Sequence, residues 1–207
     1  MNELLCIHNF LGDSLRSQLL EFAITSESRF DATLVGVGDG AVTSSFRRSR
    51  RLCDIGELQG DFETRVRGVF PRLISELGVM PFELDRCEIE MAVHTDADFY
   101  KRHVDTFTGA GRSRGGDRVI SCVYYFYQLP RAFRGGELKL YPLPTTARRA
   151  PDPLIVAPEN DLLVAFSSWM PHEVLPVQFR SQDFAKARFS VNCWLYRSST
   201  GDARAVA

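Results

Sequence analysis

The amino-terminal part of the chain has the hydrophobic spacing of amphipathic helices. A short apolar run at Leu4–Ile7 predicts a strand, and Asp13 or Ser14 after it is a suitable helix cap. The apolar positions that follow recur at i, i+4 and i+7 and are Leu15, Leu19 and Phe22. This spacing predicts a helix that begins near Asp13 and buries one face.

A second helical pattern lies further along the chain. Its apolar positions have the same period and are Phe62, Val66, Val69, Leu73 and Leu77. Gly78 follows at once, and glycine favours the left-handed end of a helix. Pro71 lies inside the series, so we expect a kink or an early break there. Residues 1–84 are therefore predicted to be a helical support region.

From about Asp85 the pattern changes to short apolar runs separated by turn residues. The predicted strands are Glu88–Val93, Phe99–Val104, Val119–Tyr127, Glu137–Tyr141, Asp161–Phe166, Glu173–Val177 and Phe189–Tyr196. Val119–Tyr127 and Phe189–Tyr196 are apolar at nearly every position, which favours strands covered on both faces. We expect a mainly β sandwich or barrel over residues 85–197, braced by the helices within one domain of residues 1–207.

Two joining segments are too rich in turn formers to be regular elements. Thr106–Asp117 contains four glycines, and Pro142–Pro153 contains four prolines. Both are predicted to be mobile loops. The small and polar segment 198–207 is predicted to be a disordered tail.

Composition restricts the partners of the chain. With 207 residues and 44% apolar content, it can bury the core of one globular domain. The net charge of −1 gives no overall attraction for nucleic acid or an anionic membrane, so we expect neither as a partner. Arg47–Arg51 is a local exception. We interpret it as a solvated edge, with contact to an acidic or backbone-rich substrate as the alternative.

The cysteines and the amino terminus bear on localisation. The five cysteines are scattered and contain no C-x-x-C pair, so neither a disulfide framework nor a zinc site is predicted. The amino terminus lacks a basic segment and a long apolar segment, and no stretch approaches membrane-spanning length. We therefore expect a cytoplasmic protein with reduced thiols.

The histidines offer a candidate metal site. Two of the four begin an H-x-D tripeptide, at His94 and at His103. Residues i and i+2 of a strand project from the same face, so such a tripeptide presents an imidazole beside a carboxylate. An imidazole from a facing strand would complete a facial triad, which leaves three adjacent positions open on Fe(II).

His172 is the expected third ligand, because it opens an apolar segment after a predicted strand. For the pair we prefer His103 and Asp105, which run out of an apolar strand into a Gly-rich loop, over His94 and Asp96, which look more like a turn. By spacing alone, the alternative remains open that these histidines are structural residues held by hydrogen bonds.

Several motifs in a fixed order carry a family resemblance. They are Tyr100-x-x-His103-x-Asp105, Arg118-Val-Ile-Ser-Cys-Val-Tyr-Tyr-Phe, Gly135-Gly-Glu-Leu, Pro171-His-Glu-Val and Arg188-Phe-Ser-Val-Asn-Cys-Trp-Leu-Tyr. In this order, over roughly residues 88 to 197, the chain resembles the 2-oxoglutarate and Fe(II)-dependent dioxygenase superfamily. It is similar in particular to the collagen-type and hypoxia-factor-type prolyl hydroxylases and their bacterial relatives.

The resemblance implies a fold, cofactors and a ligand set. The fold is a double-stranded β-helix, or jelly roll, with helices packed outside. The cofactors are Fe(II), the cosubstrate 2-oxoglutarate and O2, with ascorbate as a further candidate. His103, Asp105 and His172 match the iron ligands. Arg188 matches the base that anchors the far carboxylate of 2-oxoglutarate, and the hydroxyl of Tyr125 is expected to join it.

Other candidate pocket residues follow from strand alternation and from positions where this sequence differs from the family pattern. Arg188, Asn192 and Trp194 share one face of their strand, so Asn192 is a candidate cosubstrate contact and Trp194 a candidate pocket wall. For each residue a purely structural role is an equal alternative, as a buried amide with its hydrogen bonds satisfied for Asn192 and as a core aromatic for Trp194. Tyr100 and His94 are candidate substrate-pocket residues. His94 begins a His-Thr-Asp-Ala-Asp segment where relatives have a tyrosine and a Gly-rich turn, and residues 173–187 form a longer connection than expected.

The resemblance implies hydroxylation of an unactivated C–H bond with release of succinate and CO2. A prolyl residue in a peptide or protein is the expected substrate, and the loops at Ala41–Arg51 and Thr106–Asp117 would close over it. Hydroxylation of a free amino acid or another small metabolite is the alternative. A cupin-like metal-binding sensor without turnover is a further alternative, which Arg188 and Tyr125 disfavour.

Overall fold

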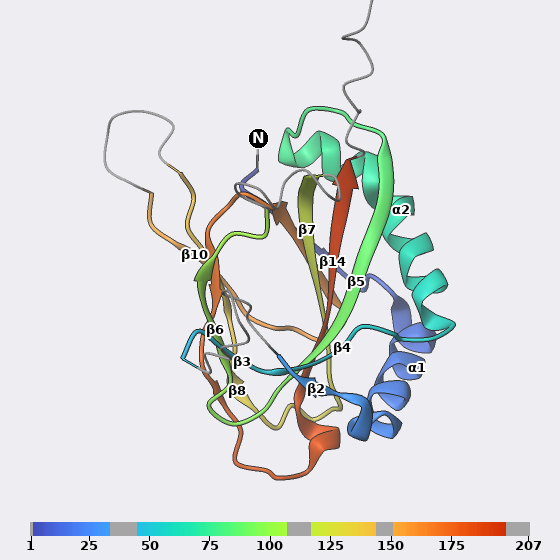
Figure 1. The fold of residues 1–207 in the computed structure, drawn as a ribbon, viewed down its shortest axis with the longest axis vertical. Helices are drawn as coiled ribbons and strands as arrows, with labels where there is room; N and C mark the ends of the chain where they lie inside the picture. Colours follow the sequence, from blue (N-terminus) through green and yellow to red (C-terminus); the bar gives the residue numbers. More distant parts are fainter. Residues whose placement is uncertain (1, 34–44, 107–116, 144–150, 198–207) are drawn as a thin grey trace, which may run out of the picture.

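A computed structural model describes residues 2–33, 45–106, 117–143 and 151–197, and antiparallel strands dominate it (Figure 1). Seven of these strands form the major sheet. Their hydrogen-bonded order is β1 (Leu4–His8), β11 (Leu162–Ser167), β7 (Asp117–Phe126), β14 (Arg188–Arg197), β5 (Leu84–His94), β4 (Arg50–Leu52) and β2 (Asp31–Ala32). The longest strands, β5, β7 and β14, are neighbours in its centre.

A minor sheet lies on one side of the major sheet (Figure 1). Its order is β10 (Leu154–Val156), β9 (Leu138–Leu140), β12 (His172–Val174), β6 (Phe99–His103) and β3 (Arg47–Arg48). A separate ribbon pairs β13 (Val177–Gln178) with β8 (Arg134–Gly135). The two sheets form the jelly roll that the sequence predicted, so the predicted fold class is confirmed.

The helices pack on the other side of the major sheet (Figure 1). They are α1 (Gly12–Thr25), α2 (Leu58–Leu77) and the short 3-10 helices η1 (Glu27–Arg29) and η3 (Phe184–Lys186). In α2, Phe62, Val66, Leu73 and Leu77 are buried, and Gly78 ends the helix with φ +62°. The helix runs through Pro71, so an early break is wrong. Buried side chains on both sides of Pro71 stabilise the helix, which outweighs the lost backbone hydrogen bond.

The major sheet separates two hydrophobic cores, and strand alternation assigns residues to them. On β7, Tyr124 and Phe126 join the core that contains the helix residues. Tyr125, which lies between them, joins the core that contains Leu138 of β9 and Phe166 of β11. The prediction that this strand is covered on both faces is confirmed, and the reason is that helices cover one face and the minor sheet covers the other.

The strand prediction needs several corrections. The predicted strand Glu173–Val177 is two strands, β12 and β13, because the chain leaves the minor sheet between them. Five strands were not predicted, namely β2, β3, β4, β8 and β10. All have two or three residues, and β2, β3, β4 and β8 contain charged residues, so they lack an apolar pattern.

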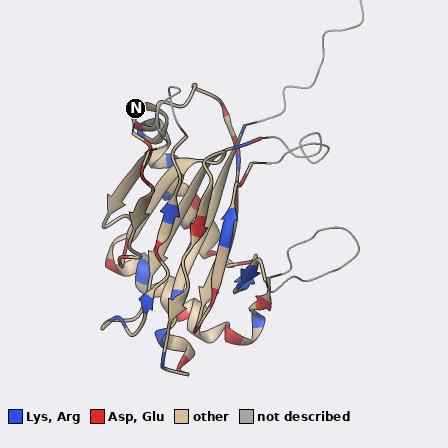
Figure 2. Cartoon of the chain, turned by 90° about the vertical axis from the view of Figure 1, so that its left-hand side faces the viewer, with Lys and Arg blue, Asp and Glu red and all other residues tan. Residues whose placement is uncertain are grey.

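The basic run Arg47–Arg51 is only in part the solvated edge that was predicted, because Arg48, Arg50 and Arg51 are 36–56% exposed whereas Arg47 is not. Arg47 and Arg48 form β3, and Arg51 belongs to β4. Arg48 pairs with Asp98 at 3.0 Å, and the side chain of Arg47 is only 10% exposed. Elsewhere, basic and acidic residues are mixed over the face drawn in Figure 2.

The remaining predictions on chain organisation concern the loops, the thiols and the membrane. All five cysteines are free, as predicted. Most of the two predicted loops, the segment Ala41–Ser44 and the tail 198–207 lie outside the described residues. No helix of the described residues is long and apolar enough to cross a bilayer.

The N-terminus of helix α1 is capped by a carboxylate that lies just before the distant strand β11, so the predicted cap at Asp13 or Ser14 is wrong. Leu11 is the cap position and makes no side-chain cap bond. Instead, the backbone N–H groups of Leu11 and Gly12 donate to the two carboxylate oxygens of Asp161, at 2.8 and 3.0 Å. The hydroxyl of Tyr124 donates to the same carboxylate at 2.9 Å. Asp161 thus joins α1 to the major sheet.

We expect Asp161→Ala to lower the free energy of unfolding by about 2 kcal/mol, because it leaves two helix N–H groups and a buried hydroxyl without an acceptor. Urea denaturation followed by circular dichroism measures this loss. Asp13→Ala is the matched control, since its carboxylate is exposed and pairs only with Arg16 nearby. Equal unfolding midpoints for both variants would contradict the assignment.

Candidate active site

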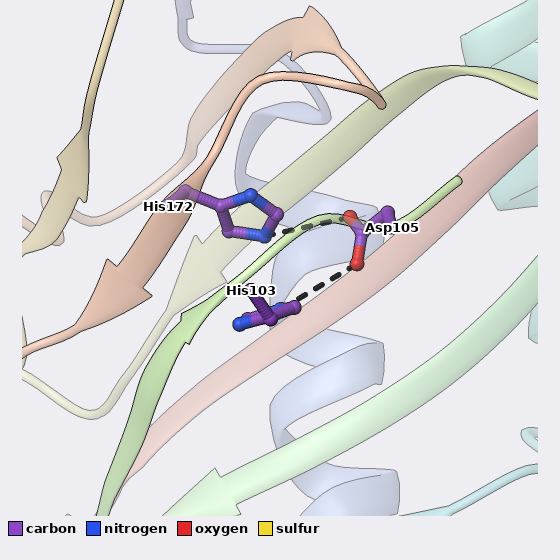
Figure 3. A group of neighbouring side chains, drawn as sticks. All are labelled: His103, Asp105 and His172. Carbon is purple, nitrogen blue, oxygen red and sulfur yellow. Dashed lines mark ion pairs between the residues drawn. The ribbon is translucent and has the colours of Figure 1, made fainter. Parts of the chain in front are cut away.

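The pairing of β6 with β12 brings two histidines together. His172 lies directly opposite His103 in the register, and the ring centroids are 4.2 Å apart. Asp105 follows two residues after the end of β6. Its two carboxylate oxygens lie 3.5 Å from Nε2 of His103 and 3.5 Å from Nε2 of His172 (Figure 3). One ligand atom from each residue lies within 4.8 Å of the others, which is the spacing of a metal site.

Backbone carbonyls fix the orientation of both imidazoles. Nδ1 of His103 bonds to the carbonyl of Lys101 at 2.8 Å, and Nδ1 of His172 bonds to the carbonyl of Met170 at 2.9 Å. A carbonyl only accepts, so Nδ1 carries the proton in each neutral ring. Nε2 therefore presents its lone pair to the space beside Asp105, as a metal ligand must.

The surroundings of Asp105 hold it ionised. The hydroxyl of Ser121 donates to Oδ2 of Asp105 at 2.7 Å, and the N–H of Asp105 donates to the carbonyl of Ser168. Burial by itself would raise the pKa of Asp105, but His172, His103 and Ser121 together bring this pKa below its usual value. Burial also lowers the pKa of His172. Two neutral imidazoles and one carboxylate are the donor set of a facial triad.

The other histidines are used differently. Asp96, the alternative carboxylate, accepts the N–H of Phe179 at 2.8 Å. His94 lies at the end of β5 and contacts Arg188, and His8 pairs with Glu159 at the surface. Among the described residues, His103, Asp105 and His172 are the one cluster with metal-ligand spacing. The structure therefore brings together the preferred pair and not the alternative one.

Arg188 is a buried cation without a carboxylate partner in the described part of the chain. It begins β14 opposite His94, and 1% of its surface is exposed. Nε donates to the carbonyl of Gly136 at 3.0 Å, and Nη1 lies 3.2 Å from Nδ1 of His94. Burial lowers the pKa of Arg188. A buried charge is costly unless it is paired, so this guanidinium is suited to an anionic ligand.

Two buried polar atoms without hydrogen-bond partners lie beside Arg188. They are the hydroxyl of Tyr125, whose ring centroid is 4.9 Å from the guanidinium carbon, and Nε2 of His94. Burial and the charges of Arg188 and Arg47 lower the pKa of His94 well below its usual value, so this ring is neutral. Because Arg188 only donates, Nδ1 of His94 accepts and Nε2 carries a free N–H. Burial raises the pKa of Tyr125 to about 12, so its hydroxyl also remains a donor.

One cavity between the two sheets connects the triad with Arg188 and His94, whereas Tyr125 packs behind Arg188 and is not part of the cavity lining. Its lining includes the three residues of the triad, Arg188 and His94. Along β14 every second residue faces it, and these residues are Arg188, Ser190, Asn192 and Trp194. Strand alternation therefore places Asn192 and Trp194 where the sequence predicted. Tyr100 also lines the cavity and stacks on the ring of His103 at 3.5 Å.

Sequence reasoning missed three contributors to this site. Ser121 donates a hydrogen bond to Asp105. The sequence did contain a signal for this residue, because Ser121, Val123 and Tyr125 alternate along one strand and therefore share one face. Gly136 packs against Arg188 so closely that a Cβ would lie 2.7 Å from Cδ of Arg188. Arg47 lines the cavity beside Tyr100. No pattern in the sequence singled out Arg47 from its basic neighbours.

Comparison with known proteins agrees with this geometry. Residues 89–196 match the model of the 2OG-Fe(II) oxygenase superfamily, and the chain belongs to that family. The predicted family is thus confirmed. The chain is also 31% identical, over 194 residues, to an uncharacterized PKHD-type hydroxylase of Synechocystis. That match covers 91% of the chain and spans 61% of the length of the relative.

Solved structures of prolyl hydroxylases have the same fold. One is a Trichoplax adhaerens prolyl hydroxylase in complex with a peptide of hypoxia-inducible factor, with a TM-score of 0.71, 20% identity and coverage of 95% of this chain and 84% of that one. Another is a Pseudomonas putida prolyl-4-hydroxylase, with a TM-score of 0.66, 21% identity and coverage of 96% and 94%. At these identities the likeness establishes the fold.

We expect His172→Ala to abolish the stabilisation that a divalent metal gives, because it removes one of three ligands. The measurement is the thermal unfolding temperature with and without Mn(II). Mn(II) is used because it does not react with oxygen during the measurement. His8→Ala is the control, since His8 lies at the surface away from the cluster. Full metal stabilisation of His172→Ala would contradict the proposed ligand set.

Proposed function

We propose that this protein is a 2-oxoglutarate- and Fe(II)-dependent dioxygenase that hydroxylates an unactivated C–H bond. His103, Asp105 and His172 are the iron ligands in this proposal. Their two lone pairs and one carboxylate suit Fe(II), and their facial arrangement leaves positions for cosubstrate and oxygen. Membership of the oxygenase superfamily supports the same assignment.

The buried guanidinium of Arg188 is the observation that carries the proposal. A metal-binding module without turnover has no use for a buried cation on the opposite wall of the metal cavity, whereas a dicarboxylate cosubstrate needs one. In this proposal Arg188 binds the far carboxylate, and the unpaired donors of His94 and Tyr125 beside it are available for further hydrogen bonds. This is the reason to disfavour the sensor alternative.

Bound iron, 2-oxoglutarate and O2 would supply the oxidising chemistry, in which succinate and CO2 are released and a hydroxyl group is added to the substrate. The protein would hold the metal ligands in position and limit the access of water to the cavity. Ser121 holds the Asp105 carboxylate, and backbone carbonyls hold both imidazoles. The cavity lies between the two sheets, which would limit the access of water to a bound cosubstrate.

A prolyl residue of a peptide or protein is the substrate we propose. The fold is that of prolyl hydroxylases, one of which is described with a bound peptide. Hydroxylation of a free amino acid is a second candidate, because Arg47 places a cation in the cavity that could bind a charged small molecule. Ascorbate as a cofactor and a cytoplasmic location stay predictions.

Three measurements test this function. Anaerobic addition of Fe(II) and 2-oxoglutarate to the wild-type chain should give the visible charge-transfer band of the chelated complex, and His172→Ala should not. Succinate release under air then tests turnover. A peptide library that contains proline, read by mass spectrometry for the gain of one oxygen atom, tests the substrate. Absence of both the band and succinate would refute the dioxygenase assignment.

We expect Arg188→Ala to weaken 2-oxoglutarate binding by about 10- to 100-fold, the range for loss of a charge-assisted hydrogen-bonded pair. Titration calorimetry of the Mn(II)-loaded protein with 2-oxoglutarate measures this affinity. Mn(II) affinity itself should be unchanged, because Arg188 is not a ligand. Arg134→Ala, an exposed arginine of β8, is the control. Unchanged affinity for 2-oxoglutarate in Arg188→Ala would remove the main support for this function.

Gly136→Ala should weaken 2-oxoglutarate binding by about tenfold or more through the position of Arg188. Gly136 has φ +70°, and a Cβ there would lie 2.8 Å from Nε of Arg188 and 2.9 Å from Val177. The guanidinium must therefore move. The same calorimetric titration measures the effect. Gly60→Ala in α2, where a Cβ meets no atom within 4 Å, is the control, and equal affinities for the two variants would show that the close approach has no consequence.

A further inference from the structure

Arg47 is a second cation in the cavity, and contacts on several sides hold it in place. Nε of Arg47 donates to the hydroxyl of Ser49 at 3.1 Å, and Nη2 donates to the carboxylate of Glu90 at 2.8 Å. The guanidinium carbon lies 4.7 Å from the ring centroid of Tyr100. Tyr100 in turn stacks on the metal-site residue His103. Arg47 is therefore one side chain away from the triad.

The contacts of Arg47 leave one nitrogen for a ligand. Nη1 has no hydrogen-bond partner among the described residues, while Nε and Nη2 are both used. The side chain lines the cavity and is 10% exposed. A fixed and largely desolvated guanidinium binds a carboxylate more strongly than a mobile surface arginine does, because little side-chain freedom is lost.

Glu90 does not need Arg47 for its own charge. The carboxylate of Glu90 also accepts from Nη1 of Arg51 at 3.1 Å, and it is 7% exposed. One cation is enough to neutralise one carboxylate. Two arginines therefore share the carboxylate of Glu90, and Arg47 is the one that lines the cavity.

The charged side chains that line the cavity also favour the binding of a further anion. In the described lining, the charged side chains are Arg47, Arg188 and Asp105. A divalent metal and the dianion 2-oxoglutarate neutralise one another, and Asp105 offsets Arg188. The charge of Arg47 is paired with Glu90, which Arg51 shares, so Arg47 can still attract a further anion in this largely buried site.

We propose that Arg47 is a specificity-determining residue that binds a carboxylate of the substrate, close to the carbon that is hydroxylated. The inference rests on the proposed function and narrows its substrate class to molecules that carry such a carboxylate. The carboxylate has two possible sources, an acidic side chain next to the reacting residue or the terminal carboxylate of a chain or free amino acid. Both present the same pair of oxygen atoms to the guanidinium.

The test uses matched probes on the protein loaded with Mn(II) and 2-oxoglutarate, so that binding is measured without turnover. The first pair is a Glu-Pro peptide and its Gln-Pro counterpart. The second pair is a peptide that ends in proline as the free acid and as the amide. The third pair is L-proline and its amide. Calorimetry gives the affinity for each probe.

We expect at least one acid to bind about 10- to 100-fold more tightly than its neutral counterpart, and the pair concerned identifies the source of the carboxylate. Arg47→Gln should abolish that preference and leave the affinity of the neutral probe unchanged. Arg51→Gln is the matched control, because it also leaves Glu90 with one arginine but removes no cation from the cavity lining. Arg47→Lys should retain part of the preference.

Several outcomes overturn the inference. They are the absence of any preference for an acid, equal loss of preference in Arg47→Gln and Arg51→Gln, and an Arg47→Gln variant whose main defect is in binding of 2-oxoglutarate. Succinate release by the wild-type chain is measured separately. If succinate is released but no probe pair shows a charge preference, the proposed function stands and the role of Arg47 fails.

Discussion

The pairing of β14 with β5 on one side and β7 on the other is the constraint on which the site depends. It places Arg188 opposite His94 and Ser190 opposite Tyr125. The donor groups of Arg188, His94 and Tyr125 therefore lie together at one end of β14. The same strand has alternate residues packed on the helices, which anchors it. The guanidinium is therefore held by a central strand that is paired on both sides, which suits the cosubstrate-binding role proposed for it.

The three residues of the candidate metal site come from the minor sheet, at the end of β6 and the start of β12, which are inner strands of that sheet. β6 and β12 are short, and Asp105 lies beyond the end of β6. What holds the three ligands is a set of polar contacts, from the carbonyls of Lys101 and Met170 to the imidazoles and from Ser121 to the carboxylate. Ser121 belongs to β7, so a residue of the major sheet positions a ligand of the minor sheet.

The cavity between the sheets combines an anionic and a cationic end. In the proposed function, Asp105 would provide the negative charge for a metal, and Arg188 the positive charge for a dicarboxylate. Arg47 adds a cation held by Glu90 and stacked near Tyr100. Together the two proposals assign separate parts of the cavity to a metal, a dianion and one further acidic group, and these parts differ in charge.

The sequence by itself determined the helices, the long strands and the candidate metal ligands. Helix and strand periods are local properties that can be recognised without the fold. The spacing of His103 and Asp105 is also local, but a second H-x-D pair has the same spacing, so the order of the motifs was needed to choose between them. Along β14 the period of two was also enough to predict that Arg188, Asn192 and Trp194 share a face.

Tertiary structure alone decided the contacts between distant segments. The cap of α1 comes from Asp161, some 150 residues away, which no local pattern reports. The free N–H of His94 follows from its bond to Arg188, and the place of Arg47 follows from the pairing of β3 with β6 and from the carboxylate of Glu90. Such contacts depend on which strands become neighbours, and burial in the sheets sets that choice.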